Sequence, residues 1–201
     1  MTGLRERKKL DTRRALSDAA LALAFERGLD HVTRDEIAAT AGVSLRTFNN
    51  YFSNKYEAVA YRQIERMQLA LARFRDQPAD QPLWDAISES VIDPLLEEGA
   101  AGVVPTAAQR DEIRKVLLAP EARAAVSKTL VEEWVVAVAD RVGAQPGDMY
   151  PRLVVGAIRA VGEAAVDSYT SADPPTPYVD LLRQGFAAIA AGLPEGSTRN
   201  A

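Results

Sequence analysis

Apolar residues recur at intervals of three and four along most of the chain, and proline and glycine interrupt this pattern. Such spacing places apolar side chains along one face of an α-helix. No stretch alternates apolar and polar residues for long enough to predict a β-strand. The pattern therefore predicts an all-α protein with about nine helices.

Four helices are predicted in the first part of the chain, over residues 9–27, 33–41, 45–52 and 54–75. Thr33 and Glu36 form the pattern of a capping box, in which a hydroxyl and a carboxylate each bind a backbone N–H at a helix start. Gly42 permits the left-handed backbone of a tight turn, and Ser44 is a favoured N-cap. This is the layout of a helix-turn-helix, whose second helix enters the DNA major groove.

A linker at residues 77–82 contains two prolines and interrupts the helical pattern. Beyond it, five more helices are predicted, over residues 83–98, 107–118, 120–142, 149–171 and 177–191. We expect residues 1–76 to form a domain with the helix-turn-helix and residues 77–194 to form a second helical domain. Residues 195–201 are expected to be a disordered tail.

Charge is divided unevenly along the chain. The formal net charge is −4, which by itself argues against a nucleic-acid partner. Residues 1–66, however, hold 12 Lys and Arg against 9 Asp and Glu, whereas residues 67–201 hold 12 against 19. Local basic groups meet phosphate, so the sign of each part matters more than the sum. The basic run at residues 5–9 is expected either to be a solvated tail or to contact the DNA.

Several functional classes find no support in the sequence. The chain has no cysteine and one histidine, which argues against disulfides, thiolate metal sites and a His-based metal cluster. No apolar run reaches the roughly 18 residues of a membrane span, and no apolar signal core follows the basic start. No G-x-S-x-G elbow, P-loop, dinucleotide-binding glycine pattern or H-E-x-x-H occurs. We therefore expect a cytoplasmic protein without cofactor, membrane contact or enzymatic activity.

A set of residues with defined spacing spans the helix-turn-helix: Thr33, Ile37, Ala38, Ala41, Gly42, Val43, Ser44, Thr47, Phe48, Tyr51, Phe52 and Lys55. On these residues the chain resembles the TetR family of bacterial one-component regulators. The resemblance implies an N-terminal DNA-binding domain followed by an all-helical ligand-binding and dimerisation domain. Asn49-Asn50 departs from the family pattern, which usually has an aromatic residue and then a basic or aromatic one. The operator of a relative therefore does not transfer to this chain.

The candidate DNA-binding residues are Thr33, Ser44, Leu45, Arg46, Thr47, Asn49, Asn50, Tyr51 and Lys55. Arginine can bind guanine O6 and N7 together, and asparagine can bind adenine N6 and N7 together. By the resemblance, Thr47, Tyr51 and Lys55 contact phosphate. Thr33 could act only as a cap, and Arg46 and Asn49 could be merely solvated. Phe48 and Phe52 are expected in the core.

The stretch at residues 113–126 (IRKVLLAPEARAAV), with the alanine-rich helix around Trp134, is similar to an actinobacterial subgroup of these regulators. That subgroup includes the regulator of mycofactocin genes and others thought to sense acyl-coenzyme A-like ligands. The resemblance implies a small-molecule effector that is hydrophobic or an acyl thioester. Candidate ligand-binding residues are Trp84, Ile87, Val91, Arg114, Leu117, Trp134 and Val138. Apolar stripes at helical spacing are equally typical of an ordinary core.

One recognition helix contacts only a few base pairs, so a symmetric homodimer is expected. The last two long helices are its expected interface. Its candidate residues are Leu153, Ala157, Ile158, Val161, Leu182, Phe186 and Ile189, which could alternatively form an intramolecular core. The predicted function is a ligand-responsive homodimeric repressor on a near-palindromic operator of double-stranded DNA. The alternative is a helical protein-interaction module that has lost DNA binding, which a weak salt dependence would reveal.

Overall fold

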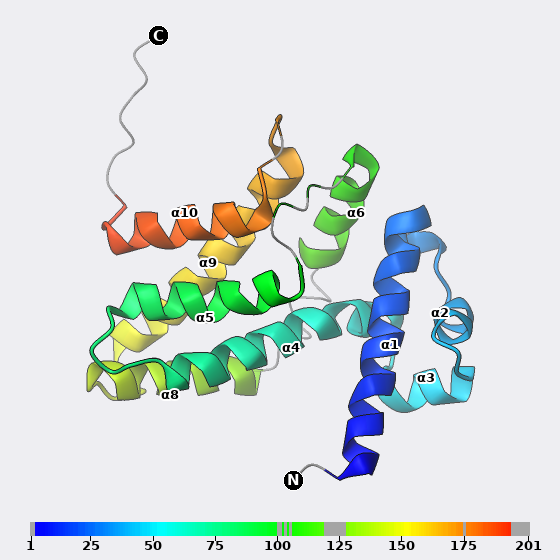
Figure 1. Cartoon of the computed structure of the whole chain (residues 1–201), viewed down its shortest axis with the longest axis horizontal. Coiled ribbons are helices and arrows are strands. Elements are labelled where there is room, and N and C mark those ends of the chain that lie inside the picture. Colours follow the sequence, from blue (N-terminus) through cyan, green and yellow to red (C-terminus); the bar gives the residue numbers. More distant parts are fainter. Residues whose placement is uncertain are drawn as a thin grey trace. The chain divides into compact units, whose positions relative to one another are not determined.

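The computed structural model describes residues 3–99, 102, 104, 106–118, 128–174 and 176–193. Every regular element in this part of the chain is helical (Figure 1), which confirms the all-α prediction. The elements are α1 (Leu4–Arg27), η1 (Leu29–His31, a 3₁₀ turn), α2 (Arg34–Thr40), α3 (Leu45–Tyr51), α4 (Lys55–Asp76), α5 (Leu83–Glu97), α6 (Ala107–Leu118), α8 (Lys128–Val142), α9 (Met149–Ser171) and α10 (Tyr178–Ala190). None of these described helices is long and apolar enough to cross a membrane.

Most helix boundaries lie within a few residues of their predicted positions. The start of α1 differs, because the helix begins at Leu4 and includes the basic run at residues 5–9. Arginine, lysine and glutamate are good helix formers, so this run extends the helix instead of forming a tail. The predicted helix at residues 120–142 is described only from Lys128 onwards. Its earlier part and the expected tail at residues 195–201 lie outside the described residues.

Two compact units make up the chain, one of residues 1–68 with 105–128 and one of residues 69–104 with 129–201. Helix α4 contributes residues to both units. The domain boundary expected at residue 77 stays a prediction. Helix α6 packs on α1 in the N-terminal unit. There, a carboxylate oxygen of Glu112 accepts a hydrogen bond from the Leu29 N–H at 3.1 Å.

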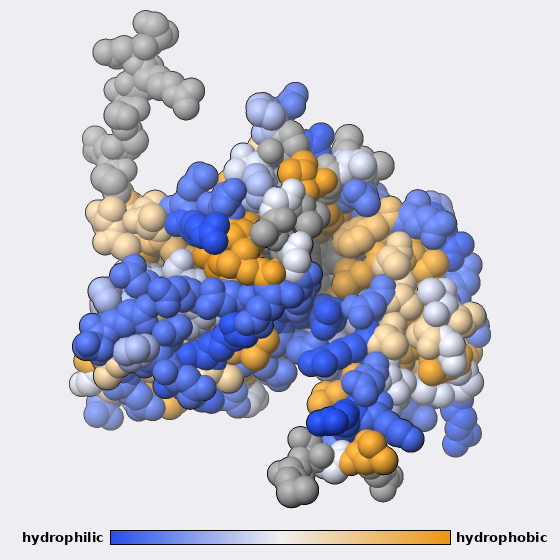
Figure 2. Space-filling model, viewed as in Figure 1, coloured by the Kyte–Doolittle hydropathy of each residue, from blue (hydrophilic) through white to orange (hydrophobic). Residues whose placement is uncertain are grey.

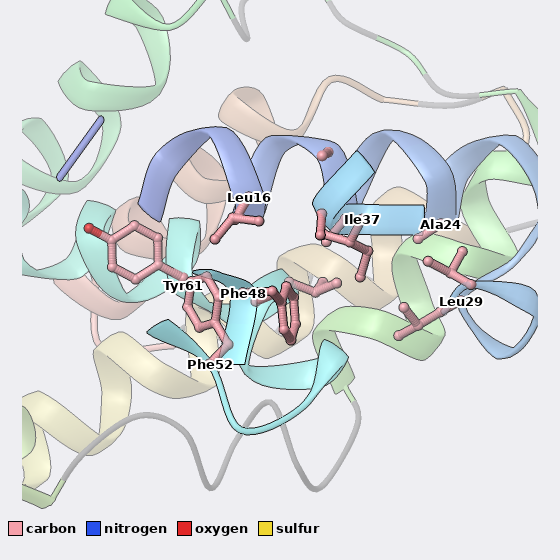
Figure 3. Packing of buried hydrophobic residues seen from close by; sticks show 13 residues of the cluster. Leu16, Ala24, Leu29, Ile37, Phe48, Phe52 and Tyr61 are labelled. Carbon is pink, nitrogen blue, oxygen red and sulfur yellow. The ribbon is translucent and has the colours of Figure 1, made fainter. Parts of the chain in front are cut away.

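The core of the N-terminal unit is formed by apolar side chains from α1, η1, α2, α3 and α4 (Figure 3). Leu16, Ile37 and Phe48 are completely buried, and Phe52 is 3% exposed. Burial of a side chain of this size contributes roughly 1.5–3 kcal/mol. The expectation that Phe48 and Phe52 belong to the core is therefore confirmed. By fixing α2 and α3 against α1, this core determines which face of α3 stays at the surface.

In the C-terminal unit, α10 packs against both α5 and α9. Gly185 permits a close approach to α9, since a Cβ atom there would lie 2.7 Å from Cγ1 of Val161. Trp134 of α8 packs on Phe74 of α4, with ring centroids 5.4 Å apart. The guanidinium of Arg141 lies over the Phe74 ring and donates hydrogen bonds to three carbonyls of the linker after α4. One arginine thus joins the end of α8 to the linker.

Candidate nucleic-acid interface

The element expected to contact DNA consists of two short capped helices, α2 and α3, with a tight turn between them. Thr33 Oγ1 accepts a hydrogen bond from the Glu36 N–H at 3.3 Å, and Glu36 Oε2 accepts one from the Thr33 N–H at 2.9 Å. The side-chain and backbone hydrogen bonds from Thr33 lower the pKa of Glu36, so the capping carboxylate is charged near neutral pH. Gly42 has a φ of +70°, and Ser44 Oγ accepts a hydrogen bond from the Thr47 N–H at 3.1 Å. The predicted caps and turn are confirmed.

Helix α3 directs Phe48 inward and three polar residues outward. Phe48 is completely buried against the core, while Arg46, Asn49 and Asn50 are exposed. The other α3 candidates lie at the margins of this exposed face, where Leu45, Thr47 and Tyr51 are half-buried. Ser44, the N-cap, is exposed. The face therefore presents a guanidinium and two amides together, the groups that recognise base edges in the major groove.

A cleft of about 550 Å³ lies between the first turns of α1 and helix α3. It is lined by Glu6, Lys8, Lys9, Thr12, Thr47, Asn50 and Tyr51. The two ammonium groups outnumber the carboxylate of Glu6 and lie beside hydroxyls and an amide, a set of donors that suits a DNA phosphate. The basic composition of residues 5–9 was the signal for this site. The helical conformation of the run, which its composition alone did not indicate, determines which lysines face α3.

Lys55 is held by backbone carbonyls. Its half-buried side chain donates hydrogen bonds to the carbonyls of Leu29 at 2.7 Å, Asp30 at 3.2 Å and Val32 at 3.1 Å. The ammonium therefore joins the start of α4 to the segment around η1. A phosphate contact by Lys55 stays a prediction. Because the ammonium is bound to carbonyls, the backbone N–H of Lys55 in the first turn of α4 would make that contact.

Arg34, at the start of α2, also belongs to the exposed reading surface. Its Nη1 atom donates a hydrogen bond to Oδ1 of Asn49 at 3.3 Å, and both side chains are exposed. No sequence motif marks Arg34 as a site residue. A basic residue beside the Thr33 cap was the only indication of a DNA contact at this position. The hydrogen bond between Arg34 and Asn49 depends on the angle at which α2 and α3 cross, which the sequence does not give.

Ion pairs join α1 to α4 beneath the site. Arg14 contacts Glu65 at 2.7 Å, and Arg62 contacts both Glu65 at 2.8 Å and Asp18 at 3.0 Å. Burial tends to raise the pKa of Glu65, but hydrogen bonds from Arg14 and Arg62 outweigh that effect and leave the pKa lowered. Above these pairs, the Arg13 guanidinium lies 4.6 Å from the centroid of the Tyr61 ring. These contacts hold α1, and with it the cleft lysines, in a fixed position relative to α4.

The candidate ligand-binding residues separate into two groups. Ile87, Trp134 and Val138 are buried in the C-terminal unit, where Trp84 and Val91 are half-buried. In contrast, Arg114 is exposed on α6 of the N-terminal unit, and the side chain of Leu117 lies outside the described residues. The buried Nε1 atom of Trp134 has no hydrogen-bond partner among the described residues. The assignment of these residues to a ligand site stays a prediction.

The candidate dimer residues differ in exposure. Leu153 is 61% exposed, and Ala157, Ile158 and Ile189 are half-buried. Three others are packed inside the C-terminal unit: Val161, Leu182 and Phe186. These three serve the intramolecular core because α9 and α10 pack on each other, so a partner could contact them only after local repacking. The homodimer itself stays a prediction.

The N-terminal and C-terminal parts of this chain each match a known protein family. Residues 16–60 match the family described as bacterial regulatory proteins, tetR family, and residues 81–194 match the MftR C-terminal domain. The chain is 27% identical over 192 residues to MftR of Mycobacterium tuberculosis, a candidate mycofactocin biosynthesis transcriptional regulator, with 93% of each chain covered. It is 32% identical over 169 residues to the HTH-type transcriptional regulator TcmR of Streptomyces glaucescens, covering 80% of this chain and 74% of TcmR.

Solved structures share the fold. FadR of Thermus thermophilus, a TetR-family transcriptional repressor in complex with lauroyl-CoA, matches with a TM-score of 0.56. The identity is 18%, over 94% of this chain and 98% of FadR. Both curated relatives are transcriptional regulators rather than enzymes. The family matches, together with the capped helix-turn-helix and its exposed polar face, establish that the chain belongs to the TetR family of bacterial transcriptional regulators.

Proposed function

We propose that this chain is a homodimeric repressor that binds a near-palindromic operator through α3 and releases it when a small effector binds. The observation that carries the proposal is the two-sided character of α3. Its buried Phe48 fixes the helix on the core, and its exposed Arg46, Asn49 and Asn50 form one polar face. In a helix-turn-helix this face lies in the major groove. Each good bidentate contact to a base contributes about 1–3 kcal/mol of discrimination.

Phosphate contacts would come from the edges of that face. Lys8 and Lys9 line the cleft beside α3, and Thr47 and Tyr51 line its other side. Lysines placed there neutralise phosphates and release counterions, so affinity should fall steeply with salt. A bacterial protein with this activity works in the cytoplasm, where the chromosome lies.

The proposed dimer surface is the exposed apolar side of α9 and the end of α10. Met149 is 71% exposed and Tyr150 is 52% exposed, and Leu153 follows on the same side of the helix. The exposed small residues Gly156, Ala160 and Ala164 continue this side at helical spacing. The C-terminal end of α10 is also hydrophobic at its surface (Figure 2), where Leu193 is 65% exposed. Large apolar side chains exposed in this way are typical of an interaction site.

The effector would be bound in the C-terminal unit. A buried indole N–H without a partner costs about 1–3 kcal/mol, and a ligand carbonyl would satisfy the N–H of Trp134. An acyl thioester offers such a carbonyl together with an apolar chain. The lauroyl-CoA bound by Thermus thermophilus FadR supports this class of effector. The effector must bind better to a conformer with low operator affinity, and operator then weakens effector binding by the same factor.

The test begins with the duplex that the purified protein enriches from genomic DNA. Affinity for this duplex should fall linearly on a log–log plot against salt concentration. Lauroyl-CoA should release the duplex, whereas coenzyme A alone should not. Trp134→Phe keeps an aromatic side chain, although a smaller one, and removes the N–H donor, so it should require more lauroyl-CoA for release and bind DNA as the wild type does. Binding that is indifferent to salt and sequence would instead favour a protein-interaction module.

A further inference from the structure

The hydrogen bond between Arg34 and Asn49 constrains how α3 can recognise a base. Arg34 is the first residue of α2, directly after the Thr33 cap, and Asn49 lies on the exposed face of α3. Nη1 of Arg34 lies 3.3 Å from Oδ1 of Asn49. Capping by Thr33 and Ser44 fixes the starts of both helices, so the two side chains meet without a rearrangement of the backbone.

The chemistry of the pair determines which end of the amide remains available. A guanidinium has only donors, so the oxygen of Asn49 must face Arg34. The NH₂ group of Asn49 is then the end left for DNA. Bidentate recognition of adenine requires both ends of the amide, with the oxygen accepting from N6 and the nitrogen donating to N7. Although an amide oxygen has two lone pairs, an asparagine whose oxygen is held toward Arg34 is not free to align both ends of its amide with N6 and N7 of adenine.

We propose that Arg34 is a positioning residue that makes Asn49 a hydrogen-bond donor to the operator, so that the position read by Asn49 is a guanine rather than an adenine. Guanine presents two acceptors, N7 and O6, to the NH₂ group in the major groove. Adenine presents the N7 acceptor, but its N6 amino group would face a second donor. This inference rests on the proposed function, because it assumes that α3 contacts base edges.

The neighbouring amide of Asn50 has a different environment. Asn50 lines the cleft with Lys8, Lys9 and Tyr51, whereas Asn49 faces α2 through Arg34. One amide is therefore placed beside the cleft lysines and the other beside a guanidinium. The two adjacent asparagines are expected to have different roles, and only the preference associated with Asn49 should depend on Arg34.

The experiment is selection from a library of random duplexes by the full-length protein, followed by sequencing. The wild type is compared with Asn49→Ala, Arg34→Ala and Arg34→Lys. Asn49→Ala identifies the symmetric pair of operator positions that Asn49 reads. Asp35→Ala is the matched control, because Asp35 is the next residue of α2 and is also exposed. Far-UV circular dichroism melting of each variant checks that it is folded.

At the positions that Asn49→Ala identifies, the wild type should enrich guanine over adenine by about fivefold or more. Arg34→Ala should lose this preference and enrich adenine, because the freed amide can use both ends. Arg34→Lys should retain guanine, since an ammonium also donates to the amide oxygen. Asp35→Ala should give the wild-type preference.

Three results would overturn the inference: a wild type that enriches adenine at these positions, an Arg34→Ala variant that keeps guanine, or an Asn49→Ala variant that changes no position. Any of these could occur while the protein still enriches a palindrome through Arg46, and the proposed function would then stand. If neither the wild type nor any variant enriches a duplex, the proposed function fails, and this inference fails with it.

Discussion

Replacing Lys55 by methionine removes the ammonium group that joins the start of α4 to η1 and keeps most of the length of the side chain. The wild-type ammonium donates to three carbonyls, those of Leu29, Asp30 and Val32. In the variant the carbonyls of Asp30 and Val32 lose this donor, and the carbonyl of Leu29 keeps only the hydrogen bond from the Val32 N–H. We expect the N-terminal unit to lose stability, because these hydrogen bonds are made inside the folded chain and not to DNA.

The magnitude follows from the number and exposure of the bonds. A hydrogen bond to a charged group contributes about 1.5–3 kcal/mol. The three bonds share one ammonium, and the half-buried site lets water reach part of the segment, so the contributions do not add. The expected loss is about 2–3 kcal/mol. That is a substantial part of the roughly 5–15 kcal/mol that stabilises a typical domain.

Two measurements separate this structural role from a phosphate contact. Urea unfolding is followed both by circular dichroism, which reports on all helices, and by tryptophan fluorescence. Both tryptophans, Trp84 and Trp134, lie in the C-terminal unit, so only the dichroism should show the earlier transition. The slope of log affinity against log salt should stay at the wild-type value for Lys55→Met. The control is Lys8→Met, which should reduce the slope by about 1.8, because each protomer of the dimer loses one phosphate contact, and change stability by less than about 0.5 kcal/mol.

A Lys55→Met protein of wild-type stability with a salt slope reduced by about 1.8, one contact for each protomer, would refute this reasoning. It would show that the ammonium leaves the carbonyls and contacts phosphate in the complex. The side-chain phosphate contact implied by the family resemblance would then be correct.

Other predictions test the packing, the dimer and the ion pairs. Gly185→Ala should destabilise the C-terminal unit by about 1–3 kcal/mol in urea unfolding, because its Cβ would meet Val161 at 2.7 Å. Gly162→Ala, with nothing within 4 Å of the new Cβ, should not, and equal effects would contradict the close approach. Leu153→Asp should convert a dimer to a monomer in sedimentation equilibrium, and a persistent dimer would move the interface elsewhere. The pKa of Glu65 is lower in the folded protein than in the unfolded chain, where it is near 4.3. The charged carboxylate therefore stabilises the fold above the unfolded pKa, and this contribution is lost as pH falls through the folded-state pKa. Glu65→Gln should therefore be less stable at pH 7 and lose less stability on acidification, whereas a wild-type acid limb would argue against the ion pairs.

The sequence predicted the reading element well because its signals are local. The Thr33 and Glu36 capping box, the Gly42 turn and the Ser44 cap each depend on residues at most four positions apart. A short stretch with these signals can adopt few other conformations. The exposed face of α3 then followed from burial of Phe48, since the helical repeat places Arg46, Asn49 and Asn50 together on a face turned away from Phe48.

Features that depend on the packing of distant segments could not be predicted in this way. The contacts of Lys55 with η1 and of Arg34 with Asn49 depend on the angles at which helices cross. No local sequence motif predicts those angles. The C-terminal helices show a related difficulty. An apolar residue such as Phe186 has the same helical spacing whether it packs within the unit or on a partner, so the pattern alone cannot separate core from dimer surface. The packing of α10 on α5 and α9 makes that distinction.

The most direct test of the central claim, that the exposed face of α3 recognises DNA, is enrichment of genomic fragments by the wild type and by Arg46→Ala at about physiological salt. We predict that the wild type enriches a near-palindrome. Arg46→Ala should lose the preference at one symmetric pair of positions and remain a dimer. Enrichment of the same palindrome with the same base preferences by both proteins would contradict the assignment of α3, and enrichment of no fragment by the wild type would contradict DNA recognition by this chain.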